Sequence, residues 1–157
     1  TDEIKRFIYR VGEKTDADVV IVFGGTNDFG HGDAPFGAMA DRTCDTFCGA
    51  VHTLCQTLLM RCPRSELVFI LPTHRWNEDD PCGDNKPAPV ATLKEYVDAM
   101  REILAYYSIP TLDLYAVGRM QPAVPVIREM YMPDGLHPSD AGHALIAERI
   151  IAFLKTL

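Results

Sequence analysis

The stretch Val19-Val-Ile-Val-Phe-Gly-Gly-Thr-Asn-Asp28 decides how this chain is expected to fold. Its apolar, β-branched first half is typical of a strand that is buried on both faces of a parallel sheet. Two glycines end the apolar run, and an amide and a carboxylate, Asn27 and Asp28, follow. Because ligands bind at the carboxyl ends of the strands in open α/β sheets, these polar residues are predicted to belong to a functional site.

Strands and helices are predicted to alternate along the rest of the chain. Apolar runs predict strands at 19–23, 67–71 and 111–115, and periodic apolar residues predict helices at 2–14, 41–61, 92–107 and 139–155. This order is typical of an α/β fold with a parallel sheet covered by helices on both faces. The length fits a single domain, residues 1–157. Three strands make a thin sheet, so we expect at least one further strand upstream of residue 1.

The charge of the chain argues against two classes of partner. The net charge is −7, from 15 basic and 22 acidic residues, and the sequence contains no basic run. This pattern is unlike the basic footprint of nucleic-acid-binding proteins and unlike a segment that binds an anionic membrane surface. No apolar stretch approaches the length of a membrane span. We therefore expect neither nucleic acid nor a membrane as a partner.

The cysteines fit neither a disulfide scaffold nor a zinc site. They are Cys44, Cys48, Cys55, Cys62 and Cys82, an odd number in a chain long enough for a hydrophobic core, and they form no close CxxC pair. The first four share one face of a predicted helix, so we predict that they pack as small buried side chains. Unpaired cysteines favour a reducing cytoplasm, although an upstream segment could carry an export signal.

A second polar sequence, Asp134-Gly-Leu-His-Pro138, precedes the last predicted helix. A carboxylate and an imidazole three residues apart in such a turn can contact each other. The carboxylate would accept a hydrogen bond from Nδ1–H of His137 and leave Nε2 free to act as a base. The turn is expected at the same edge of the sheet as Asn27. Considered alone, the pair is also compatible with a purely structural turn before a helix.

A long polar segment, residues 73–91, follows the second predicted strand and is expected to be a loop. Loops of this length in compact domains are typically functional or mobile. Its first residues, His74, Arg75 and Trp76, are placed to line a substrate pocket. Trp76 could stack on a sugar ring and Arg75 could hold a carboxylate, although a solvated loop is an equally good interpretation.

Taken together, Gly25-Thr26-Asn27-Asp28 and Asp134-Gly-Leu-His137-Pro138 resemble the third and fifth sequence blocks of the SGNH/GDSL hydrolases, in their order as well as in their residues. The resemblance spans residues 19–157. It implies a flavodoxin-like parallel sheet in a three-layer α/β/α sandwich, and the mechanism of a serine esterase or acyl-hydrolase. It also implies that His137 is the general base, that Asp134 orients it, and that Asn27 and Gly25 belong to the oxyanion hole.

The blocks that carry the family's nucleophile and a further oxyanion-hole glycine are absent from these 157 residues. Ser65 and Ser108 precede strands at the opposite edge of the sheet, and Ser139 is predicted to cap the last helix. We therefore expect the serine, in a Gly-Asp-Ser motif, upstream of residue 1. The chain is interpreted as part of a carboxylic ester hydrolase that needs no cofactor or metal. Small acyl esters are the expected substrates, above all acetyl esters on carbohydrate.

Three alternatives stay open. The first is a binding domain or pseudoenzyme that retains the fold without a nucleophile. The second is a metal-dependent phosphoesterase, in which His31 and Asp33 would join Asp28, Asp134 and His137 as ligands of types that suit such enzymes. A nucleotide-binding domain is less favoured, because no glycine-rich phosphate loop opens a helix.

Overall fold

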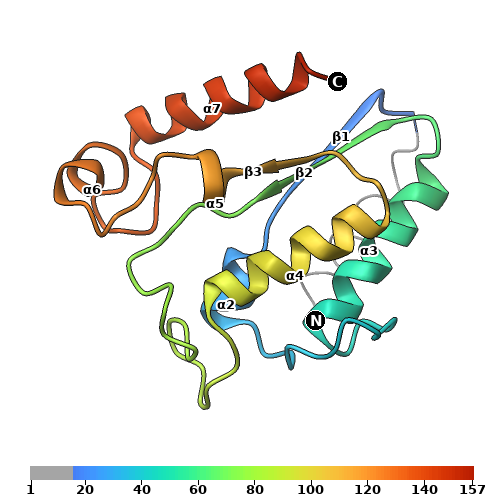
Figure 1. Cartoon of the computed structure of the whole chain (residues 1–157), viewed down its shortest axis with the longest axis horizontal. Coiled ribbons are helices and arrows are strands. Elements are labelled where there is room, and N and C mark those ends of the chain that lie inside the picture. Colours follow the sequence, from blue (N-terminus) through green and yellow to red (C-terminus); the bar gives the residue numbers. More distant parts are fainter. Residues whose placement is uncertain (1–15) are drawn as a thin grey trace.

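A three-stranded parallel sheet lies between two layers of helices in the computed structural model, which describes residues 16–157 (Figure 1). The helix predicted at 2–14 lies outside the described residues. The elements are β1 (Val19–Phe23), α2 (Thr26–His31), α3 (Phe47–Arg61), β2 (Glu66–Leu71), α4 (Leu93–Tyr106), β3 (Thr111–Asp113), α5 (Leu114–Val117), α6 (Pro125–Tyr131) and α7 (Asp140–Leu154). The α/β/α architecture predicted from the sequence is confirmed.

The central strand of the sheet is β2, which pairs in parallel with β1 on one side and with β3 on the other. In the register, Ile21 pairs with Val68, and Ile70 pairs with Leu112. Since all three strands run in the same direction, their carboxyl ends lie at one edge. The segments that leave β1 and β2 at this edge are those predicted to carry polar site residues.

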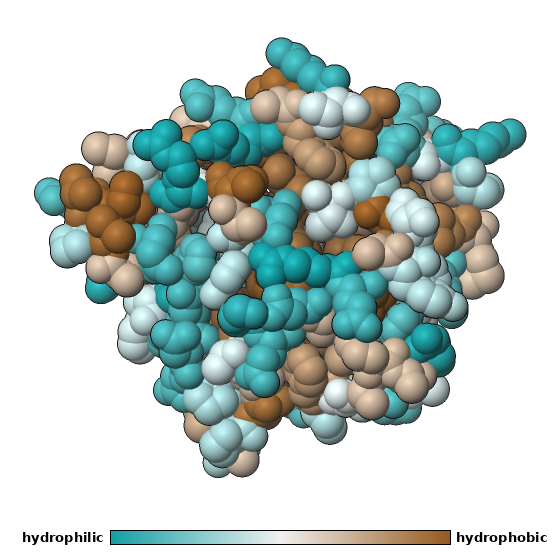
Figure 2. Space-filling view, viewed as in Figure 1, coloured by the Kyte–Doolittle hydropathy of each residue, from teal (hydrophilic) through white to brown (hydrophobic). Residues whose placement is uncertain are grey.

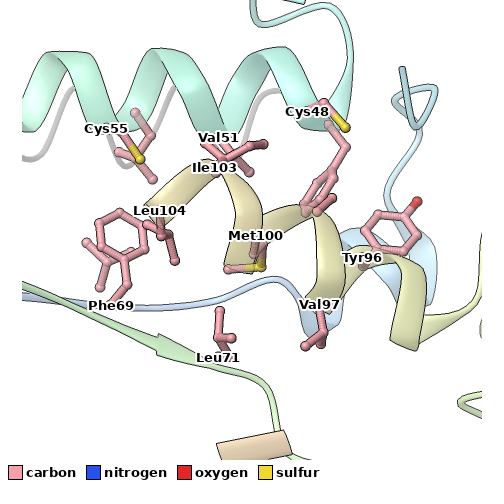
Figure 3. Packing of buried hydrophobic residues seen from close by; sticks show 14 of the residues in the cluster. Cys48, Val51, Cys55, Phe69, Leu71, Tyr96, Val97, Met100, Ile103 and Leu104 are labelled. Atoms are coloured by element: carbon pink, nitrogen blue, oxygen red, sulfur yellow. The ribbon is translucent and has the colours of Figure 1, made fainter. Parts of the chain in front are cut away.

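The larger part of the core lies between the sheet and the helices α3 and α4. Leu104 and Met100 of α4 lie between α3 and the side chains of Phe69 and Leu71 on β2 (Figure 3). The start of α4 is fixed by a capping box, in which Thr92 accepts a hydrogen bond from the backbone of Glu95 and the Glu95 carboxylate accepts one from the backbone of Thr92. These contacts hold one face of the sheet.

The opposite face of the sheet is covered by α7, which packs on Val68 and Ile70 through Ile146. The segment between β3 and α7 completes this smaller core with the buried side chains of Met120 and Met132. In Figure 1 this layer, with α6 next to α7, lies across the sheet from α3 and α4. Alternate residues of β2 therefore face two separate cores, as expected for a strand buried on both sides.

One face of β1 is not covered within residues 16–157. Val19, Ile21 and Phe23 alternate with less exposed neighbours and are 44–47% exposed. In the described part of the chain, β1 pairs with β2 alone, so its outer edge has no strand beside it. The apolar run that predicted a fully buried strand is therefore buried only in part by the described residues.

Several boundaries differ from the sequence prediction for local reasons. The helix expected at 41–61 begins at Phe47, because Thr46 accepts a hydrogen bond from the backbone of Gly49 and caps it there. The strand expected at 111–115 ends at Asp113, whose side chain caps the short helix α5. Two short helices were not predicted from the sequence: α2, which follows directly after Gly25, and α6, which begins with Pro125.

The buried cysteines pack as predicted for small apolar side chains. Cys48, Cys55 and Cys62 are almost fully buried. The prediction was wrong for Cys44, which is half-buried because it precedes the start of α3 at Phe47; Cys82 is half-buried too. Burial raises the pKa of the Cys55 thiol to about 12, which keeps it protonated at neutral pH. Among the described residues, none of the cysteines forms a disulfide.

The surface of the molecule is mixed in character. In the view of Figure 2, hydrophilic side chains cover much of the centre and hydrophobic side chains form separate patches. Among the described residues, no helix combines the length and the apolar character needed to cross a membrane.

Candidate active site

A cavity of about 590 Å³ opens at the carboxyl ends of β1 and β2. Its walls come from the segments that follow these two strands, from the turn before α7 and from α7 itself. The residues that line it include Phe23, Asn27, His74, His137, His143 and Ile150. The two polar sequences that the analysis of the sequence singled out, around Asn27 and His137, therefore meet at one cavity.

The turn after β1 depends on Gly25. Its φ of +106° lies in the left-handed region, where residues with a side chain are strained. A Cβ atom at this position would also lie 2.8 Å from Sδ of Met100 and 3.3 Å from Cγ of Pro72. The glycine thus lets the chain turn tightly against α4 and the end of β2. This turn begins α2 and places Asn27 at the cavity.

The Asp134–His137 turn contains the predicted contact. Oδ2 of Asp134 lies 2.7 Å from Nδ1 of His137, and Oδ1 accepts hydrogen bonds from the backbone amides of Leu136 at 2.8 Å and of His137 at 2.7 Å. The one carboxylate therefore closes the turn with one oxygen and orients the imidazole with the other. The Nε2 atom of His137 is left available to a reacting group.

Electrostatics keep Asp134 ionised. The hydrogen bond from His137 and the two backbone amides lower the pKa of Asp134 to about 2. An ionised carboxylate accepts hydrogen bonds and donates none, so Nδ1 of His137 carries the proton and the neutral ring has its free lone pair on Nε2. Both side chains are exposed within the described residues, His137 by 76% and Asp134 by 55%. The pair has the orientation of a general base and its carboxylate partner.

Trp76 supports the turn and does not line the cavity. Its backbone amide donates a hydrogen bond of 2.9 Å to the carbonyl of Gly135. Gly135 has a φ of +80°, and a Cβ atom there would lie 2.7 Å from Cβ of Trp76. The indole is 62% exposed. Trp76 therefore packs against the Asp134–His137 turn at Gly135, where no residue with a side chain would fit.

Arg75 is among the residues that line the cavity, but only 2% of its surface is exposed and its donors are occupied by protein partners. Its Nη2 pairs with Asp84, and its Nε donates a hydrogen bond of 2.8 Å to Oδ1 of Asn77. Its Nη1 lies 3.3 Å from the carbonyl of Thr26, at the start of α2. The guanidinium carbon lies 5.1 Å from the ring centre of Phe29. Arg75 thus joins the long loop to the helix that carries Asn27.

His74 lines the cavity and belongs to a second histidine–carboxylate pair. Nδ1 of His74 lies 2.7 Å from Oε2 of Glu78, and Gln121 donates to the other carboxylate oxygen at 3.1 Å. The sequence analysis did not identify Glu78 or Gln121. The spacing of four residues between His74 and Glu78 is a local signal that could have indicated the first. No local signal indicates Gln121, which is 43 residues from Glu78 along the chain.

The serines of the chain are occupied or lie away from the cavity lining. Ser65 donates to the carbonyl of Ala17, and Ser139 caps α7 as predicted, accepting from the backbone of Gly142 and donating to the carbonyl of Met130. Ser108 lies in the turn after α4, with a φ of 54°. Within residues 16–157, none of the three is among the residues that line the cavity.

The residues of the metal-site alternative do not gather into a cluster. His31 lies on α2 with its Nδ1 3.9 Å from Asp84, whereas His137 pairs with Asp134. Among the described residues, no three histidine, cysteine or acidic side chains are placed together as ligands of one metal ion.

The fold and this site define an α/β protein with a histidine–carboxylate pair at the carboxyl edge of its sheet. The chain belongs to the GDSL-like Lipase/Acylhydrolase family, whose sequence profile matches residues 3–145. The resemblance seen in the sequence is thereby confirmed.

Individual relatives agree with this membership. The chain is 29% identical to the GDSL lipase Rv0518 of Mycobacterium tuberculosis over 141 residues, which cover 89% of this chain and 51% of that protein. It thus spans about half the length of this curated relative. A protein from Lactobacillus plantarum of known structure is 32% identical, with a TM-score of 0.83 over 95% of this chain and 72% of the other.

More distant structures share the fold. A lipase/acylhydrolase from Enterococcus faecalis aligns with a TM-score of 0.66 at 20% identity, over 98% of this chain and 70% of that one. A structure described as a peptidoglycan O-acetylesterase aligns with a TM-score of 0.69 at 18% identity, over 94% of this chain and 40% of the other.

Replacing Arg75 with alanine is expected to destabilise the protein by about 2 kcal/mol, because the change removes the buried guanidinium and leaves Asp84 and Asn77 without their partner. Urea unfolding measures the loss. Lys94→Ala is the matched control: it also removes the cation of an ion pair, but Lys94 is 63% exposed and its pair with Asp98 is expected to contribute less than about 0.5 kcal/mol. Equal losses in the two variants would contradict the role of Arg75.

The same contacts predict a dependence of stability on pH. Burial raises the pKa of Asp84. Hydrogen bonds from Arg75 and Asn77 and the charge of Arg75 lower it by more than burial raises it, so the net pKa lies below the ordinary 3.8. The stabilisation is complete above the ordinary pKa and is lost as pH falls through the lower folded-state pKa. Between about pH 5 and about pH 3, urea midpoints should therefore fall more steeply for the wild-type protein than for Arg75→Ala. Parallel curves would argue against this origin of the pKa shift.

Proposed function

We propose that this chain is part of a serine esterase that hydrolyses small acyl esters, with acetyl esters on carbohydrate as the favoured class. The observation that carries the proposal is the Asp134–His137 hydrogen bond at the cavity that Asn27 also lines. Membership of the GDSL-like family supports hydrolysis of an ester in general terms. The residues of the site, and their roles, are part of the proposal.

The proposed reaction uses His137 twice. Its Nε2 takes the proton of a serine hydroxyl as the serine oxygen attacks the ester carbonyl, and it then gives that proton to the departing alcohol. Asp134 holds the ring in the required tautomer and stabilises the imidazolium. Asn27 donates a side-chain N–H to the negative oxygen of the tetrahedral intermediate. Water then attacks the acyl-enzyme in the same way and releases the acid.

The nucleophile is proposed to come from a segment that is not part of these 157 residues. A strand ending in Gly-Asp-Ser would pair with the free outer edge of β1. The unpaired outer edge of β1 supports this placement, because within residues 16–157 its backbone groups have no strand beside them. The carboxyl end of such a strand would lie next to that of β1, at the cavity. Residues 1–15 contain no serine.

The substrate class rests on the cavity and on the long polar loop. The cavity combines an apolar wall, which includes Ile146 and Ile150 of α7, with polar side chains such as Asn27 and His74; the apolar wall suits a small acyl group and the polar side chains suit an alcohol with polar groups. Hydrolysis of an acetyl ester on carbohydrate is the activity that one structural neighbour carries in its description as a peptidoglycan O-acetylesterase. That neighbour shares the fold of this chain.

The intact protein is expected to react with a fluorophosphonate probe at one serine, and His137→Ala is expected to abolish the adduct, because the serine then loses its base. Intact mass spectrometry measures the labelling. The control is His31→Ala, since His31 lies outside the cavity lining and should not affect labelling.

The labelling experiment also separates the alternatives. Absence of an adduct on the intact wild-type protein would contradict the proposal and favour a non-catalytic domain. Loss of esterase activity on chelation, or in His31→Ala, would instead favour the metal-dependent alternative.

Asn27→Ala is expected to lower kcat about 100-fold with little change in KM, because the amide acts on charge that develops only in the tetrahedral intermediate. Hydrolysis of p-nitrophenyl acetate by the intact protein measures both constants. Asn85→Ala provides the control, as this exposed asparagine of the long loop does not line the cavity. An unchanged kcat in Asn27→Ala would remove Asn27 from the oxyanion hole.

A further inference from the structure

His74 is held in place from several sides. Its Nδ1 lies 2.7 Å from Oε2 of Glu78. Gln121 places Nε2 at 3.1 Å from both Oε1 of Glu78 and Nδ1 of His74, and its own Oε1 accepts a 3.0 Å hydrogen bond from the backbone of Ala123. The imidazole also lies against the ring of Tyr115, with ring centres 3.8 Å apart and planes inclined at 34°. The position and the rotation of the ring are therefore fixed.

The partners of His74 also fix which nitrogen carries its proton. Burial raises the pKa of the Glu78 carboxyl. Hydrogen bonds from His74, Gln121 and the backbone amide of Arg75, together with the charge of His74, lower it by more than burial raises it, so the net pKa is below the ordinary value. The carboxylate is therefore ionised at neutral pH and can only accept hydrogen bonds. The Gln121 amide donates to the same carboxylate, so its 3.1 Å approach to the protonated Nδ1 of His74 is a contact between two donors and is not a hydrogen bond. In the neutral imidazole of His74, Nδ1 thus carries the proton and Nε2 carries the lone pair.

The Nε2 atom of His74 has no hydrogen-bond partner within residues 16–157, although the residue lines the cavity next to Asn27 and His137. The cavity therefore contains two histidine–carboxylate pairs that differ in exposure. His137 and Asp134 are 76% and 55% exposed, whereas His74 and Glu78 are 20% and 14% exposed. The first pair is accessible to a reacting group. The second is an oriented hydrogen-bond acceptor held on a rigid support.

We propose that His74 is a specificity-determining residue, whose Nε2 accepts a hydrogen bond from a free hydroxyl on the alcohol half of the ester. This inference rests on the proposed function and narrows it, because it selects esters of polyols, such as partly acetylated sugars. A hydroxyl fits an acceptor, whereas a carboxylate or phosphate would need a donor and would face the nearby charge of Glu78. An ester whose alcohol half has no further free hydroxyl would leave Nε2 of His74 without a hydrogen-bond partner on binding. An enzyme discriminates strongly against substrates that leave its buried polar groups unpaired in this way.

The test compares two acetyl esters in the intact protein: methyl 6-O-acetyl glucoside, whose alcohol half has free hydroxyls, and p-nitrophenyl acetate, whose alcohol half has none. In His74→Leu, which removes the acceptor, we expect KM for the sugar ester to rise about tenfold or more while kcat for both esters stays within about twofold. His74→Gln, which restores an acceptor near the position of Nε2, should recover part of the lost affinity. His31→Leu is the control outside the cavity.

Two outcomes would overturn the inference while leaving the proposed function intact. If His74→Leu impairs both esters equally, His74 supports the fold or the chemistry and does not select the alcohol. If it impairs neither, Nε2 does not bind substrate.

A binding measurement keeps the inference testable even if the intact protein hydrolyses no ester. Methyl glucoside is titrated into wild-type protein and His74→Leu, and binding is followed by imidazole resonances in NMR spectra. Saturable shifts of the His74 resonances, together with weaker binding to the variant, would support the hydroxyl site although the esterase proposal had failed. Absence of binding to the wild-type protein would overturn the inference.

Discussion

The parallel pairing of β1 with β2 is the constraint on which the rest of this structure depends. It brings the chain that leaves β1 at Gly24 and the chain that leaves β2 at Pro72 to the same edge of the sheet. Both departures contribute cavity walls, and the packing of α7 on the far face of β2 brings the Asp134–His137 turn to the same place. An antiparallel arrangement would separate these segments by the length of a strand. The parallel direction of the strands thus sets where the cavity lies, and the side chains of the segments that meet there form its walls.

Close approaches of backbone and side chains then fix the geometry at this edge. Gly25 turns against Met100, and Gly135 turns against Trp76, each with a positive φ and no room for a Cβ atom. Arg75 connects the two sides, since it is bonded to the loop after β2 and also to the carbonyl of Thr26. A charged side chain that sequence reasoning assigned to substrate is thus occupied within the protein. The Arg75 guanidinium can be buried because Asp84, Asn77 and the carbonyl of Thr26 accept its hydrogen bonds.

The two histidine–carboxylate pairs differ in which contacts hold them. Asp134 and His137 form a turn of four residues, and their contact depends on nothing distant in the chain. His74 and Glu78 are also close in sequence, but Gln121 and Tyr115 arrive from beyond β3 to complete their surroundings. We propose proton transfer for the exposed pair and recognition of a hydroxyl for the enclosed pair, whose ring is held by more partners.

The sequence by itself determined the features that depend on neighbours along the chain. Apolar runs predicted the strands, and apolar periodicity with the cap Ser139 predicted helices, because backbone hydrogen bonding and side-chain periodicity are local. The Asp134–His137 contact was predictable for the same reason. Boundaries were missed where a cap such as Thr46 decides between turn and helix. Only the tertiary structure decided that Arg75 is buried, that Trp76 lies behind the turn and that Gln121 reaches Glu78. Burial and partner choice depend on segments that are distant in sequence, and no local pattern encodes which of them will meet.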